Sequence, residues 1–424
     1  MSLPSHRRVV VTGIAAFCPI GFDLDAIWQA LHEGRSGVRP ITSIDVSSLP
    51  VQFGGELPGF DAKKYFDKDE RKSLKMMART VQIGVACAKQ AYANAGASKS
   101  TIDPTRFGVD FGSSLIPTEL DDLAAAAVLC AEPGRAGVNL TKWGLEGISQ
   151  VQPLWMLKYL PNMVACHVSI MLDAQGPNNS ITESDAAGLL ALGEAYRIIR
   201  RGHADFMLTG AADSKINPLS LVRQNLFAQL SHRNEAPAEA CRPFDRTRDG
   251  WVIGEGAGML ALEDLDHARR RNAPILAEIV GFGCAFDRDR SGDGIARAIR
   301  AALGGVAPAD IDHVNAHGLS TTDSDAWEAR GIRAALDDVP VFAPKSYFGS
   351  LSAAGGPVEL IASVLAMKHG MAPGTLNYRE PDPACPVVVS RDPRPMRKKL
   401  AVKLSLTDAG QVAAAVMRRW EDAP

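Results

Sequence analysis

Short runs of β-branched and apolar residues alternate along the chain with longer, alanine-rich stretches in which apolar side chains recur every three or four positions. The short runs are typical of buried strands, and the longer stretches are typical of amphipathic helices. Their alternation predicts an α/β fold in which helices cover a sheet. Strands are expected at 8–13, 106–112, 206–212, 275–283 and 313–316, and helices at 74–95, 185–200 and 294–303.

The pattern restarts near Asp264. The last strand, helix and strand of this series repeat the order seen earlier in the chain, although the residues themselves do not repeat. A repeated pattern indicates two similar halves, which we place at 1–264 and 265–424.

Two segments interrupt this pattern. The glycine-rich run 254–258 reads GEGAG, but no strand, glycine loop and helix with a ribose-binding acid surround it, so we expect a tight turn between strands and not a phosphate-binding loop. The segment 117–152 holds few recognisable turn signals, and no elements are predicted for it.

Composition excludes several classes of function. The chain has 424 residues, of which 46% are hydrophobic, enough for a large buried core. Lys and Arg number 46 against 48 acidic residues, and a net charge of −2 provides no field for attracting nucleic acid. No apolar run is long enough to cross a bilayer, so we expect no membrane span.

The start of the chain and the cysteines indicate a cytoplasmic protein. Residues 1–8 lead into a strand-like run without the apolar region of a signal peptide. The seven cysteines form no CxxC pair and have no metal-ligand spacing with histidine, so we expect reduced thiols and no metal site.

The segment 176–188, GPNNSITESDAAG, places Asp185 where a strand gives way to a helix. Unpaired N–H groups and the helix dipole stabilise a negative charge there. Asp185 is therefore either a reactive carboxylate or a helix cap, and both interpretations stay open. Ser184 lies one residue earlier, where the strand pleat should turn its side chain to the other face.

Five segments together resemble the β-ketoacyl-acyl-carrier-protein synthases, the elongating condensing enzymes of fatty acid and polyketide synthesis. The longest, 241–258, reads CRPFDRTRDGWVIGEGAG and is similar to the family's RPFDxxRDGFVxGEGAG. The segments 314–321 (VNAHGLST) and 345–356 (KSYFGSLSAAGG) are similar to VNAHGTST and KSxxGHxxGAAG. The segment 176–188 resembles the nucleophile segment, and 404–412 (LSLTDAGQV) stands where NSFGFGGTN is expected.

The resemblance implies a thiolase-like fold of two pseudo-repeated halves in five α-β-α-β-α layers. It also implies that Asp185 replaces the nucleophilic cysteine and that Ser350 replaces the second of two catalytic histidines. His317 corresponds to the first histidine, and Lys345 and Glu359 match the family's supporting residues. Condensation needs a thiolate and two imidazoles. Four substitutions, those of Asp185 and Ser350 and two more at Leu319 and Asp408, therefore fall on the chemistry and not on the scaffold.

Three further residues are assigned to the substrate site through the resemblance. Thr321 keeps one of two hydroxyls that grip the phosphopantetheine arm, whereas Leu319 replaces the other. Asp408 stands about where a gating aromatic is expected. Cys166 falls in a segment that lines the acyl tunnel near the dimer interface, and it is not expected to be a displaced nucleophile.

We expect a divergent, non-condensing member that acts as a partner subunit in the manner of chain-length factors. Its expected partners are acyl carrier protein and a second subunit, in a homodimer or in a heterodimer with an active ketosynthase. No cofactor is expected apart from the phosphopantetheine of a carrier protein, or CoA, as the substrate arm.

An enzyme of altered chemistry is the alternative, a decarboxylase or hydrolase of acyl or malonyl thioesters. Asp185, His317 and Ser350 have the composition of a Ser-His-Asp triad, but their spacing does not establish its geometry. Ordinary elongation would need another thiol to reach the site. The basic residues between Lys63 and Lys75 could receive an acidic carrier, although a solvated helix face explains them as well.

Overall fold

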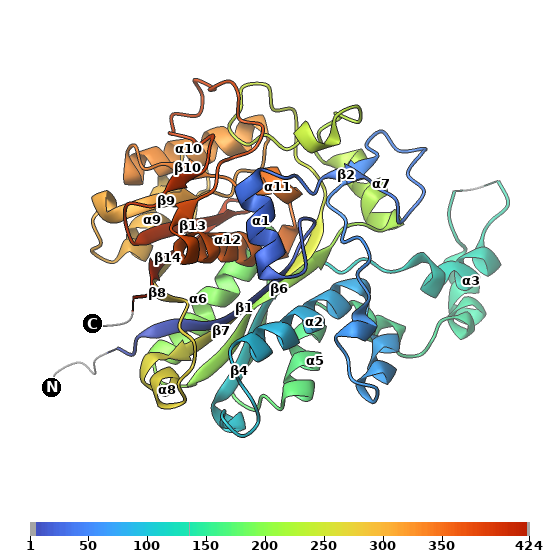
Figure 1. Ribbon diagram of the computed structural model, residues 1–424. Coiled ribbons are helices and arrows are strands. Elements are labelled where there is room, and N and C mark those ends of the chain that lie inside the picture. Colours follow the sequence, from blue (N-terminus) through green and yellow to red (C-terminus); the bar gives the residue numbers. More distant parts are fainter. Residues whose placement is uncertain (1–5, 135, 422–424) are drawn as a thin grey trace.

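A ten-stranded mixed sheet runs through the computed structural model, which describes residues 6–134 and 136–421 (Figure 1). Its strand order is β10-β9-β13-β14-β8-β1-β7-β6-β4-β5. The strands are β1 (Val9–Phe17), β4 (Phe107–Ser113), β5 (Asn178–Thr182), β6 (Phe206–Ser214), β7 (Glu255–Asp264), β8 (Ala277–Phe286), β9 (Ile311–Asn315), β10 (Val341–Phe342), β13 (Leu400–Leu406) and β14 (Gln411–Arg419). Two short pairs stand apart, β2 (Arg39–Pro40) with β3 (Phe53–Gly54) and β11 (Met371–Ala372) with β12 (Arg394–Pro395).

Helices cover both faces of this sheet (Figure 1). They are α1 (Leu24–Glu33), α2 (Arg79–Asn94), α3 (Leu120–Cys130), α4 (Leu140–Leu145), α5 (Met163–Leu172), α6 (Ala187–Arg200), α7 (Pro218–Phe227), α8 (Leu265–Arg270), α9 (Asp293–Leu303), α10 (Thr322–Leu336), α11 (Lys345–Phe348) and α12 (Gly355–His369).

The sheet consists of two five-strand sets with the same connectivity. One set runs β1-β7-β6-β4-β5 and the other β8-β14-β13-β9-β10, so each follows the order first, fifth, fourth, second, third along the chain. Strand directions match as well, because β4–β5 and β9–β10 are parallel and β1–β7 and β8–β14 are antiparallel. The predicted pseudo-repeated halves are thus confirmed, and β7 ends at Asp264.

Two helices separate the sets and produce the five layers. α6 contacts β4 and β6 of one set and β8 and β14 of the other, while α12 contacts β7 and β13. The residues of α12 from Gly355 to Met367 are all buried, as expected for a helix that is apolar all round. α2 and α5 cover the outer face of the first set, and α9 covers that of the second.

The expected turn at 254–258 is wrong, because β7 runs through most of this segment from Glu255. A Cβ atom on Gly258 would lie 2.6 Å from the backbone nitrogen of Val358, and one on Gly256 would lie 2.6 Å from the carbonyl oxygen of Phe17. The glycines therefore permit close packing within the sheet and against α12, not a turn.

The remaining differences concern boundaries and the unassigned insertion. The helix expected from residue 74 begins at Arg79, after a 3-10 turn over Glu70–Met76. The segment 117–152 forms α3 and α4, which project to one side of the molecule (Figure 1).

β5 is the outer strand of its set, so one edge of β5 pairs with no other strand among the described residues.

Candidate active site

A strained turn joins β5 to α6 and presents Asp185. Ser184 has φ +45°, an uncommon value for a residue other than glycine, and its pseudo-symmetric counterpart Ser352, before α12, has φ +49°. The turn directs Ser184 toward Asp185, and its hydroxyl donates a 3.1 Å hydrogen bond to Asp185 Oδ2. The expectation that Ser184 faces away is therefore wrong, because the strand pleat ends at Thr182.

The turn opens into a cavity of about 710 Å³. It brings together five sequence-predicted site residues, namely Asp185, His317, Thr321, Ser350 and Asp408. Other lining residues include Ser114, Thr182, Ser184, Lys215, Arg223, Phe227, Trp251, Arg290, Leu319, Asp323, Ser352 and Leu406. Hydroxyl and charged groups make up much of this wall, so the cavity beside Asp185 is polar.

Asp185 accepts hydrogen bonds from two hydroxyls. Ser350 Oγ donates to its Oδ1 at 3.0 Å and Ser184 Oγ to its Oδ2 at 3.1 Å. Burial raises the pKa of Asp185, while the charge of Lys345 and these two hydrogen bonds oppose the rise. Asp185 lies in the 3-10 turn Ser184–Ala186, which comes directly before α6. Neither this turn nor α6 has a side-chain cap, so the described hydrogen bonds of Asp185 are with residues of the cavity and not with the helix end.

His317 is held as a neutral imidazole. Its Nδ1 lies 3.1 Å from Lys345 Nζ, which also donates to the His317 carbonyl oxygen at 2.9 Å and to Glu359 Oε1 at 2.7 Å. Burial and the charges of Lys345 and Lys403 lower the pKa of His317 well below its usual value. Since the lysine is a donor only, Nδ1 accepts and the proton of the ring is on Nε2.

Buried charges behind His317 form a continuous network. Glu359 binds Lys345 through one oxygen and Lys403 through the other, and both lysines are buried. Glu328 accepts from the backbone N–H groups of His317 at 2.6 Å and Gly318 at 2.7 Å. This network fixes the loop that carries His317.

A Ser-His-Asp triad is only partly assembled. The Ser350–Asp185 bond is present, but within residues 6–134 and 136–421 His317 makes a side-chain hydrogen bond to Lys345 and none to Ser350 or Asp185. The Nδ1 position that an aspartate would hold in a triad is taken by a lysine. No hydroxyl activated by His317 follows from this geometry.

The remaining predicted substrate residues lie in different places. Thr321 is buried at the cavity wall, beside Leu319. Asp408 is exposed at the cavity, and its carbonyl oxygen accepts a hydrogen bond from Arg290. Cys166 does not line this cavity; it is half-buried on α5, which packs against α2 and β5.

Sequence reasoning missed several residues of the site. Lys403 was not singled out, although a lysine in the apolar strand LAVKLSL indicates a buried acidic partner. Glu328 gave no local signal, because its partners are backbone N–H groups, those of His317 and Gly318, in the loop before α10. Lys215, Arg223 and Arg290 are brought to the cavity only by the fold.

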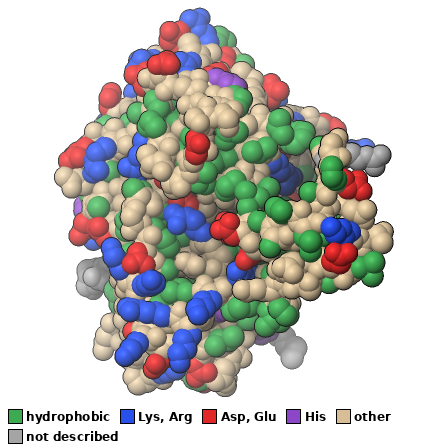
Figure 2. All heavy atoms as spheres, turned by 90° about the vertical axis from the view of Figure 1, so that its right-hand side faces the viewer, with side chains coloured by type: hydrophobic (Ala, Val, Ile, Leu, Met, Phe, Trp, Pro, Cys, Tyr) green, Lys and Arg blue, Asp and Glu red, His purple; other side chains and the backbone are tan. Residues whose placement is uncertain are grey.

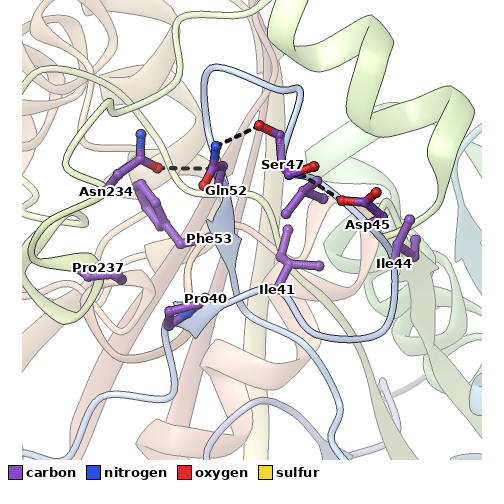
Figure 3. A pocket seen from close by; sticks show the side chains of 10 residues that line it. Pro40, Ile41, Ile44, Asp45, Ser47, Gln52, Phe53, Asn234 and Pro237 are labelled. Atoms are coloured by element: carbon purple, nitrogen blue, oxygen red, sulfur yellow. Dashed lines mark hydrogen bonds between the residues drawn. The ribbon is translucent and has the colours of Figure 1, made fainter.

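A separate cavity of about 320 Å³ lies between the β2–β3 loop and the segment near Asn234 (Figure 3). Its polar groups bond to one another, since Asn234 Oδ1 accepts from the Gln52 backbone N–H at 3.0 Å and Gln52 Nε2 donates to the Ser47 carbonyl at 3.2 Å. Asp45 is the one ionisable residue in its described lining. We assign it no chemistry.

Other features are absent from the part of the chain that the structure describes. There, no group of three or more His, Cys, Asp or Glu residues has the geometry of a metal site. No helix within the same ranges has the length and apolarity needed to cross a membrane. All seven cysteines are free thiols, as expected.

Comparison with known proteins gives consistent relatives. The chain is 34% identical over 429 residues to the 3-oxoacyl-[acyl-carrier-protein] synthase 2 of Coxiella burnetii, covering 98% of this chain and 99% of the relative. It is 36% identical over 391 residues to the protein of the same description from Synechocystis, covering 89% and 90%.

Solved structures agree with these relatives. A β-ketoacyl synthase from Burkholderia phymatum superposes with a TM-score of 0.87 at 31% identity, over 98% of this chain and all of that one (100%). The ishigamide ketosynthase/chain length factor superposes with a TM-score of 0.84 at 29% identity, over 98% and 100%.

Family models match both halves of the chain. The N-terminal domain of β-ketoacyl synthases matches residues 6–268, and the C-terminal domain matches residues 276–379. Together with the retained fold and the support of His317, these matches show that the chain belongs to the β-ketoacyl synthase family.

Proposed function

We propose that this protein is a non-condensing ketosynthase-family subunit that shapes an acyl-binding site in the manner of a chain-length factor. The observation that carries the proposal is the Asp185–Ser350 hydrogen bond, because it fills the reacting positions with a carboxylate and a hydroxyl. A carboxylate cannot hold an acyl group as a useful thioester, and a single imidazole, His317, is left to bind the malonyl oxygen.

The proposed partners are a carrier protein and a second subunit. One neighbouring structure is described as a type II polyketide acyl-carrier protein in complex with its ketosynthase, which supports an acyl carrier as the partner here. Lys63, Lys64, Arg71, Lys72 and Lys75 are all exposed and offer a basic surface for it. The phosphopantetheine or CoA arm would belong to the substrate, with Thr321 at the wall it follows.

An unpaired strand edge and exposed apolar side chains support assembly with a second subunit. β5 is the outer strand of its set, and an exposed edge is a ready site for pairing. Hydrophobic side chains gather over the face on which α3 and α7 lie (Figure 2). Among the most exposed are Val128, Leu140, Leu145, Ile170, Leu226 and Phe227. We propose a dimer in which Cys166 lies near the interface.

A thioester hydrolase is the second candidate. The specific observation in its favour is again Ser350, whose hydroxyl donates to the carboxylate of Asp185 at 3.0 Å. For decarboxylation, an ionised Asp185 would repel a malonyl carboxylate, whereas Lys215, Arg223 and Arg290 in the same cavity would attract it, so the carbon dioxide measurement decides this reaction. We further propose domain limits of 1–264 and 265–424, and a cytoplasmic protein without a resident cofactor.

Thioester turnover separates the candidates. The full-length protein is incubated with acyl and malonyl carrier proteins, and free carrier thiol and carbon dioxide are measured. The proposal expects neither above the level without protein. Thiol release that is abolished by Ser350→Ala would establish the hydrolase instead.

Light scattering at micromolar concentration tests the proposed assembly with a second subunit. A stable monomer, both alone and when mixed with a condensing ketosynthase, would contradict it.

A further inference from the structure

A second, apolar groove opens where the two five-strand sets separate. β1 and β8 pair only from Val9 to Val11, opposite Ile279 to Ala277, and Pro274 lies just before β8. Beyond that point β1 pairs only with β7 and β8 only with β14, and α1 lies beside α12 (Figure 1). The resulting cavity has a volume of about 280 Å³ and shares no lining residue with the cavity of Asp185.

Apolar side chains form the floor and walls of this groove. Ile14 comes from β1, Leu24 from the start of α1, Leu276 from the segment before β8, and Val364 and Leu365 from α12. A cavity of about 150 Å³ holds a six-carbon ring, so this groove has room for a chain of roughly ten carbons. A larger cavity of about 640 Å³ adjoins it and shares Ile14, Leu24, Leu276 and Lys368 with it.

The charged residues in the described lining of the groove are two cations, Lys368 and Arg419, and that described lining includes no acid. Lys368 is exposed at the end of α12 and Arg419 is half-buried at the end of β14. Neither side chain makes a hydrogen bond or ion pair with another described residue. Asp23 and Asp25 line the adjoining cavity together with Lys368, whereas Arg419 lines the groove alone, so an anion is favoured at Arg419.

The cations are not needed to complete the end of α12. The helix stops at Gly370, which has φ +69° and whose backbone N–H bonds to the Ala366 carbonyl oxygen. An apolar groove with a few convergent polar groups is the usual form of a small-molecule site. Here the charged groups of the described lining are both positive, and most of the other lining side chains are apolar.

We propose that this groove binds a medium-chain carboxylate, such as a free fatty acid of about ten carbons. Its tail lies along Ile14, Leu276 and Leu365, and its carboxylate lies between Lys368 and Arg419. The site is independent of the proposed function, because it is built from other residues than the Asp185 cavity.

Equilibrium dialysis of decanoate against the full-length protein tests the proposal. We expect saturable binding that becomes at least tenfold weaker in the double variant Lys368→Ala, Arg419→Ala. Lys368 is exposed and Arg419 is half-buried, so this variant should fold. Decan-1-ol has the same tail without the charge, and it should bind the unmodified protein at least tenfold more weakly than decanoate. Its affinity for the double variant should equal its affinity for the unmodified protein.

Lys99→Ala combined with Arg201→Ala is the matched control, because it removes two exposed cations that line none of these cavities. It should bind decanoate as the unmodified protein does. Equal affinity in the groove variant and the control variant would overturn the proposal, and this is the result expected if decanoate entered the Asp185 cavity. Absence of saturable binding would also overturn it.

Discussion

Ser350 donates a 3.0 Å hydrogen bond to Asp185 across 165 positions of sequence. The two residues come from the two pseudo-repeated halves and meet at the site that their junction forms. In this arrangement a carboxylate that burial would otherwise disfavour receives a donor from the opposite half.

Ser350→Ala should destabilise the protein in a pH-dependent way. The hydroxyl lowers the pKa of Asp185, so its removal raises that pKa further and penalises the ionised form. For an acid, this loss is absent while Asp185 is protonated and grows as pH rises through its folded-state pKa. Urea unfolding as a function of pH should show the loss rising to a plateau about 1–2 kcal/mol above its acidic value. Ser350→Thr, which keeps the hydroxyl, should not show this difference.

The double variant Asp185→Cys, Ser350→His should regain acyl loading. A cysteine in the 3-10 turn before α6 would gain the thiolate stabilisation of a helix N-terminus, and a second imidazole would join His317. Elongation should stay poor, because Asp408 stands where the gating aromatic is expected. Loading and product formation are measured on the same samples; efficient elongation by the variant would show that Asp408 does not limit the site.

Lys345→Met should be strongly destabilising. The side chain is buried, and its removal leaves one Glu359 oxygen and His317 Nδ1 without their lysine partner. Breaking a buried charge pair on one side costs about 3 kcal/mol or more. Chemical unfolding measures the loss. Lys399→Met, which breaks an exposed pair with Glu421, is the control and should cost less than about 1 kcal/mol.

Asp110→Val should stabilise the protein, most strongly at alkaline pH. Asp110 is buried in β4, neither of its carboxylate oxygens has a described hydrogen-bond partner, and burial raises its pKa to about 8. A raised carboxyl pKa gives stability that is lost as pH rises from the unfolded value through the folded one. Between pH 5.5 and pH 8 the gain of the valine variant should grow by about 3 kcal/mol. A gain that is equal at both pH values would contradict this reading of Asp110.

Local sequence signals predicted the elements that position the site. The periodicity gave the helix behind Asp185 and the strands β4 and β6 within one or two residues of their ends. These elements are long and regular, so local pattern is a sufficient guide. The repeated halves were also visible as a pattern, although their identical strand order needed the structure.

Features that depend on distant contacts were not predictable in this way. Ser184 has a positive φ without being a glycine or asparagine, and it lies where the starts of α6 and α12 contact each other, a contact that local sequence does not reveal. The glycines of β7 were misread because their close neighbours, Val358 and Phe17, are far away in sequence. Glu359, the partner of Lys403, is also remote, 44 residues away in sequence.

The intact mass of the unmodified protein after incubation with acyl carrier and malonyl carrier tests the central claim most directly. With Asp185 at the nucleophile position, we predict no acyl adduct on the protein and no 3-oxoacyl product on the carrier. An adduct that maps to this chain, together with condensation product, would contradict the account.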